Sequence, residues 1–290
     1  MIESYHTTRV FAVDEFNFAM DMLDTYSWLS RDHHRRGFDE LMDRLVLSSE
    51  ERLLIESLFE KFVYVDVDYC EQLLSRIVSQ IIDVWGCRVL DTVVMTTRAK
   101  PKENDGSLVF LKQLQDRLYG WKDRNFINIY EKQRRFPTVK EFHNIILVDD
   151  FIGSGYTMSE RYETLLREMN SLKSKRNVYV VALAGMSAAR NNYPILKSDN
   201  VFVPLWLDKA FERYADRRET EVMEQILDRL YYINSDGKRY NLNKYRYGYR
   251  DMASLYYNVH YRVPNNVLPI FWWSVLDEEP SEYHSMFRRA

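Results

Sequence analysis

The sequence has 290 residues, of which 46% are hydrophobic and 29% charged, so it can fold as one large domain or two small ones. The formal net charge of −3 excludes a global basic field that would draw the whole chain to nucleic acid or to an anionic membrane. The cysteines, Cys70 and Cys87, are too few for a disulfide scaffold or a cysteine-based zinc site. No apolar stretch approaches the roughly 20 residues of a membrane span, and no signal sequence opens the chain, so we expect a cytoplasmic protein.

The N-terminal region, residues 1–87, is expected to be helical. Ser48 and Glu51 have the spacing of a capping box, and apolar residues recur after them with a helical period. The same period returns over residues 74–85. We therefore expect a set of helices ahead of the main fold.

After this region, short apolar runs alternate with helix-length amphipathic stretches. One of these stretches has Ser107 as its expected N-cap and ends at Gly120. The alternation predicts an α/β core over 88–206, with a Rossmann-like parallel sheet flanked by helices, and a C-terminal extension over 207–290. The expected strands are residues 89–95, 126–130, 145–148, 178–184 and 201–205.

Residues 145–157, Ile-Ile-Leu-Val-Asp-Asp-Phe-Ile-Gly-Ser-Gly-Tyr-Thr, are the most informative segment. Glycine is scarce, with 9 in 290 residues, yet Gly153 and Gly155 lie two positions apart here. The apolar residues predict a buried central strand, and Asp149 and Asp150 follow at its carboxyl end, where open α/β sheets bind ligands. The spaced glycines, two hydroxyls and the start of a helix then form a cradle for an anion such as a phosphate.

Two other interpretations fit part of this segment. The glycines could merely shape a tight connection, although such connections seldom combine paired acids, spaced glycines and hydroxyls. Apolar residues that end in acids are also typical of a Walker B strand. That site needs a Gly-Lys-Ser/Thr loop, and the only Gly-Lys pair, Gly237-Lys238, is followed by Arg239. A sugar phosphate would satisfy both the acids and the turn, and we favour it.

The segment resembles the phosphoribosyl-pyrophosphate (PRPP) motif of type I phosphoribosyltransferases. The resemblance implies that Asp149 and Asp150 contact the ribose hydroxyls at the catalytic centre and that Mg²⁺ accompanies PRPP; it assigns no metal ligand to the chain itself. Gly153 stands where threonine is frequent in the family, and Tyr156 where glycine is frequent. The implied loop for the 5′-phosphate consists of Gly153, Ser154, Gly155, Tyr156 and Thr157.

The same resemblance gives roles to two further loops. Thr97 and Arg98, after the first expected strand, would bind the pyrophosphate, with Arg98 in a catalytic role. A mobile lid over residues 131–143 would cover the pyrophosphate with basic side chains. A solvated basic surface is the alternative for both segments. The basic residues of the lid are Lys132, Arg134, Arg135 and Lys140.

The C-terminal part, with Tyr-Gly-Tyr at 247–249 and the segment 264–273, resembles phosphoribosyltransferase-like proteins of bacterial conflict and antiphage systems, including retron-type operons. That resemblance implies an effector, or toxin, held in a complex with a reverse transcriptase and its nucleic acid. In physical terms, Pro-Asn-Asn at 264–266 predicts a turn, and the apolar aromatics after it predict a buried closing strand. Packing is the favoured interpretation of Trp272 and Trp273.

Residues 237–250 form a candidate for local contact with nucleic acid. They include five basic residues, four interleaved tyrosines and no acids. Positive charges follow phosphates and aromatic rings stack on bases, although an exposed basic loop is the alternative. The histidines of the chain have no metal-ligand spacing.

These observations lead to two functional hypotheses. The first is a phosphoribosyltransferase-like enzyme that uses PRPP, or a related ribosyl phosphate, with Mg²⁺ and has no membrane partner. The second is a non-catalytic sensor or interaction module that keeps the ligand pocket without turnover. The acceptor does not follow from either.

Overall fold

The computed structural model of the chain describes residues 13–98, 106–130, 139–170, 175–213, 215–230, 232–233, 239–240, 244–273 and 283–287. The chain folds into two compact units, which we call the sheet unit and the helical unit. The sheet unit comprises Val63–Ala210 and Tyr247–Val267, and the helical unit comprises Met1–Phe62, Phe211–Arg246 and Leu268–Ala290. These bounds differ from the expected ranges 1–87, 88–206 and 207–290, because each unit takes in part of the C-terminal region.

The sheet unit contains the expected parallel sheet. The strand order is β3-β2-β4-β5-β6, with β7 also paired to β5, and every pair is parallel. This arrangement confirms the predicted α/β fold class. The strands are β2 (Thr92–Arg98), β3 (Phe126–Tyr130), β4 (Asn144–Ile152), β5 (Asn177–Met186), β6 (Val201–Phe202) and β7 (Leu205–Leu207).

Three of the differences from the expected strand bounds have local reasons. β2 begins at Thr92 because the residues before it form a turn, in which the Asp91 carboxylate accepts a bond from the Thr92 hydroxyl at 2.8 Å. β4 continues to Ile152, so the two adjacent aspartates lie in the last part of the strand and not after it. The expected strand 201–205 is divided into β6 and β7 around Pro204, which has no backbone N–H to donate.

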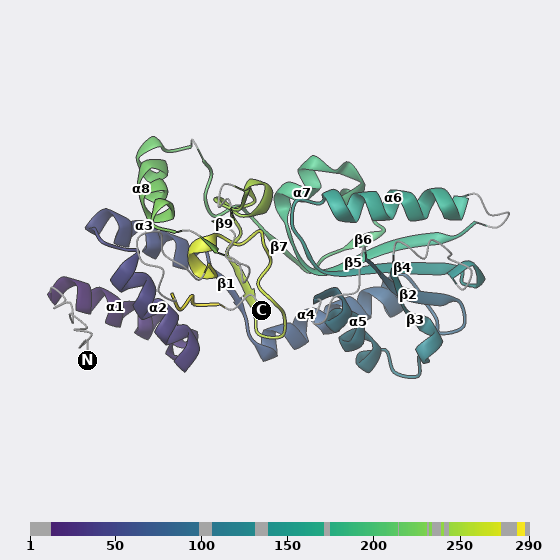
Figure 1. Cartoon of the computed structure of the whole chain (residues 1–290). Coiled ribbons are helices and arrows are strands. Elements are labelled where there is room, and N and C mark those ends of the chain that lie inside the picture. Colours follow the sequence, from purple (N-terminus) through teal and green to yellow (C-terminus); the bar gives the residue numbers. More distant parts are fainter. Residues whose placement is uncertain are drawn as a thin grey trace. The chain divides into compact units, whose positions relative to one another are not determined.

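Helices cover both faces of this sheet, with α6 on one face and α4 and α5 on the other (Figure 1). Apolar side chains of β2, β4 and β5 pack against Met158, Tyr162, Leu165 and Met169 of α6. The helical period predicted for this stretch is therefore that of a core-facing helix. The helices are α4 (Val67–Ser79), η2 (Gln80–Val84), α5 (Gly106–Arg117), η3 (Asp123–Asn125), η5 (Val139–Glu141), α6 (Tyr156–Asn170), α7 (Ser187–Asn192), η6 (Pro194–Lys197) and η8 (Tyr249–Asp251).

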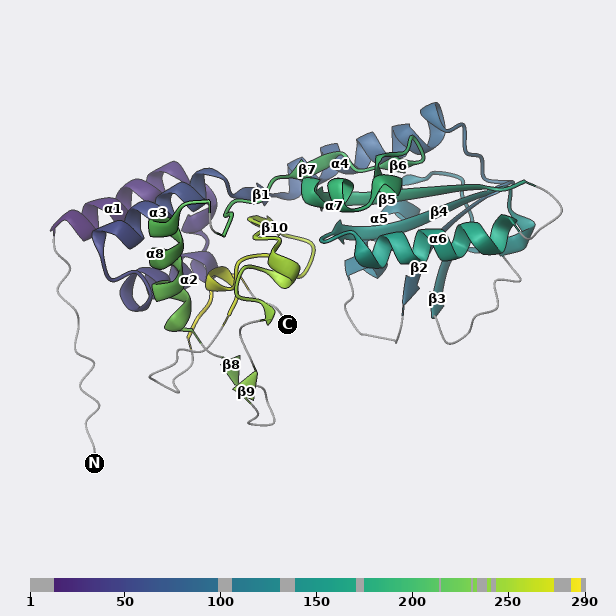
Figure 2. The same cartoon turned by 90° about the horizontal axis from the view of Figure 1, so that it is seen from above.

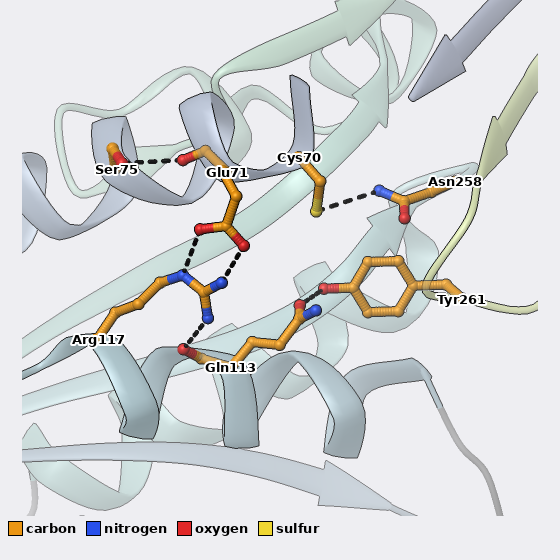
Figure 3. A network of polar contacts seen from close by, with 7 residues as sticks. All are labelled: Cys70, Glu71, Ser75, Gln113, Arg117, Asn258 and Tyr261. Atoms are coloured by element: carbon orange, nitrogen blue, oxygen red, sulfur yellow. Dashed lines mark hydrogen bonds and ion pairs between the residues drawn. The ribbon is translucent and has the colours of Figure 1, made fainter. Parts of the chain in front are cut away.

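The C-terminal segment 247–267 belongs to the sheet unit. Its strand β10 (Tyr256–Asn258) pairs in parallel with β1 (Val63–Val65). Figure 3 shows a polar network that connects α4, α5 and this segment. Arg117 of α5 forms an ion pair with Glu71 of α4, and the Tyr261 hydroxyl is hydrogen bonded to Gln113 of α5. These long-range contacts explain why the sheet unit does not end near residue 206.

The helical unit contains α1 (Val13–Thr25), η1 (Ser27–Ser30), α2 (Asp32–Arg44), α3 (Ser49–Glu60), α8 (Arg217–Asp228) and η9 (Pro269–Phe271), with the pair β8 (Tyr232–Ile233) and β9 (Arg239–Tyr240). Helices α3 and α8 lie side by side (Figures 1 and 2). The predicted capping box is confirmed, since the Glu51 backbone N–H donates to Ser48 Oγ at 3.2 Å. The Glu51 carboxylate is buried and pairs with Arg229 at 2.8 Å.

The predicted closing strand at the end of the chain is wrong. The aromatic segment forms the short helix η9, because Pro269 at its first position fixes a helical φ and needs no donor partner. The Trp272 and Trp273 backbone N–H groups both donate to the Pro269 carbonyl, at 3.0 and 2.8 Å. Both tryptophans are buried, as the packing interpretation requires.

Both cysteines are free and buried. Burial raises the pKa of Cys87 to about 11, because the thiolate would lose its hydration. This thiol is therefore neutral near pH 7 and is a packing residue and not a nucleophile. In the described part of the chain, no helix is both long enough and apolar enough to cross a bilayer.

Candidate functional site

The order of the strands indicates where a ligand would bind. β2 has β3 on one side and β4 on the other, so the connection from β2 to β3 runs in one direction along the sheet and the connections from β3 to β4 and β5 run in the opposite direction. Open α/β sheets bind ligands outside the carboxyl ends of the strands at such a switch point. The carboxyl end of β4 holds Asp149 and Asp150, so the sequence motif lies at the position where open α/β sheets typically bind ligands.

The two aspartates are held by partners from α5 and α6. Ser107 Oγ donates to Asp149 Oδ1 at 2.6 Å and lies 3.3 Å from Asp150 Oδ1. Arg161 of α6 places its Nη1 atom 3.8 Å from Asp149 Oδ2, and the Asp150 backbone N–H donates to Asp149 Oδ1. A nearby guanidinium and several hydrogen-bond donors compensate the negative charge of the two side chains. Two neighbouring carboxylates can therefore coexist at the end of a buried strand.

The start of α5 is part of this site, which the sequence did not indicate. Ser107 was expected to cap the helix, but α5 begins at Gly106 and the Ser107 hydroxyl is directed to the aspartates. The N-cap prediction is wrong because the side chain has a charged acceptor within reach. A Cβ atom on Gly106 would lie 2.1 Å from Asp150 Oδ2, so only glycine allows α5 to approach this closely. The scarcity of glycine could have drawn attention to Gly106 as well.

The turn between β4 and α6 has the shape of an anion cradle. Gly155 has a φ of +84°, and an added Cβ atom would lie 2.9 Å from a ring carbon of Tyr193. The expected sharp turn is thus present at Gly155. Helix α6 begins at the next residue, so its first backbone N–H groups and the positive end of its dipole face the turn. The Ser154 side chain is half-buried and that of Thr157 is exposed.

Gly153 is required by a side chain from the C-terminal segment. A Cβ atom at this position would lie 2.1 Å from Asn266 Oδ1. Asn266 is buried, and its Nδ2 donates to the Tyr249 carbonyl at 2.9 Å. The departure from the threonine that is frequent in the family therefore has a physical cause. Sequence reasoning treated Asn266 as a turn residue only, because nothing local connects it to residue 153.

The structure does not describe the side chains of several predicted site residues. Thr97 and Arg98 are the last residues of β2, paired with Ile129 and Tyr130 of β3, so their backbone lies at the carboxyl edge of the sheet. Their side chains, and that of Lys140, lie outside what the structure describes. The lid residues Lys132, Arg134 and Arg135 also lie outside the described residues.

The basic stretch 237–250 is divided between the two units. Arg246, in the helical unit, forms ion pairs with Glu224 and Asp228 of α8, and these pairs together with hydrogen bonds raise its pKa despite burial. Tyr247 is buried in the sheet unit. Arg250 lies over the ring of Tyr156, 4.2 Å from its centroid. Residues 234–238 and 241–243 lie outside the described residues.

Comparison with known proteins identifies the family. The family model for PRTase-CE matches residues 11–289. No curated protein matches the sequence. Solved structures with similar folds include Helicobacter pylori xanthine-guanine-hypoxanthine phosphoribosyltransferase, at 13% identity and a TM-score of 0.34 over 50% of this chain and 83% of that one. Schistosoma mansoni hypoxanthine-guanine phosphoribosyltransferase with IMP has 19% identity and a TM-score of 0.35 over 51% and 68%.

The family match covers almost all of the chain, including the helical unit and the C-terminal segment that contacts the turn after β4. The type I phosphoribosyltransferase resemblance of residues 145–157 is thereby confirmed at the level of the family. The chain belongs to the phosphoribosyltransferase family PRTase-CE.

Proposed function

We propose that this protein binds PRPP, or a related ribosyl phosphate, and transfers the ribosyl phosphate group to an acceptor. The observation that carries the proposal is that Asp149, Asp150 and the turn 153–157 lie together at the switch point of a parallel sheet. The two carboxylates are suited to the ribose hydroxyls, as acceptors of hydrogen bonds. The turn at the start of α6 is suited to the 5′-phosphate.

A magnesium ion fits this site if the ligand supplies most of its oxygens. Within the described residues no group of three or more histidine, cysteine or acidic side chains could hold a metal ion. Mg²⁺ typically binds through one or two carboxylates, waters and substrate phosphates, and Asp149 and Asp150 can supply such carboxylates. When bound with PRPP, the ion would neutralise charge on the pyrophosphate.

The proposed reaction is a displacement at the anomeric carbon. The bond from this carbon to the pyrophosphate oxygen breaks, the pyrophosphate leaves with the electron pair, and a bond to the acceptor forms as the acceptor loses a proton. The carbon passes through an oxocarbenium-like state, so the protein acts mainly by positioning the reactants and by stabilising charge. Thr97, Arg98 and the basic lid residues Lys132, Arg134 and Arg135 are proposed to hold the pyrophosphate.

Pyrophosphate release tests whether the site turns over. We expect the wild-type protein, incubated with PRPP, Mg²⁺ and a panel of bases, nucleotides and tRNA, to release pyrophosphate with at least one acceptor. The double variant Asp149→Asn/Asp150→Asn should release none above background. Binding of PRPP without release for any acceptor would favour the sensor hypothesis, in which the pocket is kept without turnover.

We further propose that the protein is the effector, or toxin, of a bacterial antiphage system such as a retron. The sequence resemblance of residues 247–249 and 264–273 supports this role. The proposed partners are a reverse transcriptase and its nucleic acid. Lys238, Arg239 and Lys244 remain the candidates for local contact with nucleic acid, since Arg246 is paired within the helical unit.

Growth of bacteria that express the protein alone tests the effector role. We expect slowed growth for wild type and normal growth for Asp150→Asn at equal protein level, because a toxin that acts through its transferase site needs the acid. Harmless expression of the wild type, with no co-purifying partner, would instead indicate an ordinary metabolic transferase.

A further inference from the structure

Arg250 of the C-terminal segment is brought to the anion turn by an unusual backbone. Its guanidinium carbon lies 4.2 Å from the centroid of the Tyr156 ring, and Tyr156 is the first residue of α6. The ring is itself fixed, since the Tyr156 hydroxyl donates to Glu160 one helical turn later at 2.7 Å. Arg250 is exposed, and its described contacts are with tyrosines: Tyr156, Tyr249 and Tyr193.

The backbone that carries Arg250 is strained. Arg250, Asp251 and Ala253 have φ angles of 59°, 54° and 41°, a region that side-chain-bearing residues rarely adopt. Tight hydrogen bonds hold this conformation, such as Tyr249 N–H to the Asn265 carbonyl at 2.7 Å and Ala253 N–H to the Tyr247 carbonyl at 2.7 Å. Strain of this kind persists where the surroundings over-determine it, and it gathers at ligand-binding sites.

The position of Arg250 over the Tyr156 ring keeps the guanidinium available to an anion. A guanidinium has five N–H donors, and a position over an aromatic face does not block those in its plane. The hydrogen bonds to Tyr249 and Tyr193 use part of this set, so the group can still bind a phosphate. Hydrogen bonding to Tyr249 raises the pKa of Arg250, so the group stays charged. A lysine would have the charge but neither the planar fork nor the stacking.

We infer that Arg250 is a ligand-binding residue of the site, which contacts the phosphate held at the turn 153–157 and makes the site selective for a phosphorylated ribosyl group. The inference rests on the proposed function, because it assigns a partner to the same phosphate. It also reassigns Arg250, which the sequence placed in a surface for nucleic acid. The arginine acts from a segment about 100 positions after the loop that it completes.

Binding of three ligands separates this inference from the proposed function. PRPP with Mg²⁺, ribose 5-phosphate and inorganic phosphate are titrated by calorimetry into wild type, Arg250→Ala, Arg250→Lys and Arg250→Gly. The matched control is Arg167→Ala, an exposed arginine at the far end of α6, about 16 Å from Tyr156 along the helix. We expect Arg250→Ala to weaken PRPP and ribose 5-phosphate about tenfold or more and to flatten the salt dependence, with a smaller loss for Arg250→Lys and none for the control.

Arg250→Gly distinguishes the contribution of the side chain to binding from that of the strained backbone. Glycine adopts positive φ without strain, so this variant should melt at or above the wild-type temperature and still lose the affinity. Wild-type affinity in Arg250→Gly or in Arg250→Ala would overturn the inference and leave the PRPP proposal intact. If wild type bound ribose 5-phosphate or phosphate through Arg250 but not PRPP, the inference would stand and the PRPP proposal would fail. If wild type bound none of the three, both would fail.

Discussion

Replacement of Asp149 and Asp150 by asparagine is expected to weaken PRPP binding by at least about a hundredfold, because a hydrogen bond to a charged group is worth about 1.5–3 kcal/mol and two such groups are lost. Asparagine keeps the shape of the side chain but offers one acceptor oxygen and no charge to the ribose hydroxyls and to Mg²⁺. Calorimetric titration of PRPP with Mg²⁺ measures the change. Without Mg²⁺, the difference in PRPP affinity between the wild type and the double variant should be smaller.

The control for this experiment is Asp199→Asn, an exposed aspartate of the same unit. It removes one negative charge far from the carboxyl end of β4 in sequence and should bind PRPP as wild type does. Equal PRPP affinity in wild type and in the double variant would remove the two aspartates from the donor site. A lowered melting temperature in the double variant alone would indicate loss of the bonds to Ser107 and not of ligand contacts.

Local sequence patterns were sufficient to predict the sheet and the part of the candidate site that residues 149–157 form. Strands and flanking helices follow from apolar periodicity, which depends on residues that are close in sequence. The run of acids, glycines and hydroxyls at 149–157 is also local, and the structure places it at the carboxyl end of a central strand. The same reasoning misplaced the start of one helix, because the Ser107 hydroxyl donates to the distant Asp149 carboxylate and does not cap the helix.

Long-range contacts account for what the sequence did not indicate. The segment 247–267 returns to the sheet unit through the pairing of β10 with β1, and it supplies Asn266 and Arg250 to the turn. No pattern within about ten residues of either side chain indicates a partner more than 90 positions away in the sequence. Charge alone placed Arg250 in a candidate surface for nucleic acid, because a sequence does not show the Tyr156 ring over which its guanidinium lies.

The scarcity of glycine was the one local signal that could have indicated contacts between residues distant in sequence. Gly106, Gly153 and Gly248 each lie where an added Cβ atom would fall 2.0–2.1 Å from another atom, contributed by Asp150 or Asn266. Gly155 also has a positive φ. Four of the 9 glycines thus allow close approach around the candidate site. Gly106 begins α5 and Gly248 lies in the C-terminal segment, so the scarcity of glycine alone would have indicated that both elements belong to the candidate site.

The substitution Gly153→Thr, which introduces the residue frequent in the wider family, is expected to damage this protein. Gly153 does not have a positive φ, so the obstacle is space: the new side chain would occupy the position of the Asn266 amide. Overpacking of this kind costs about 1–3 kcal/mol, so we expect a lower melting temperature and a PRPP affinity reduced by about tenfold or more as the loop is displaced.

A double-mutant cycle with Asn266→Ala identifies the cause. The single variant Asn266→Ala loses the bond from Nδ2 to the Tyr249 carbonyl and should cost about 1 kcal/mol by itself. Because alanine lacks the amide that collides with residue 153, adding Gly153→Thr to it should cost much less than in wild type, which is a favourable coupling between the two sites. Strict additivity would mean that Asn266 is not what excludes a side chain at 153. Recovery of both stability and PRPP affinity in the double variant would instead show that this family member exchanged the hydroxyl of its loop for a contact with its own C-terminal segment.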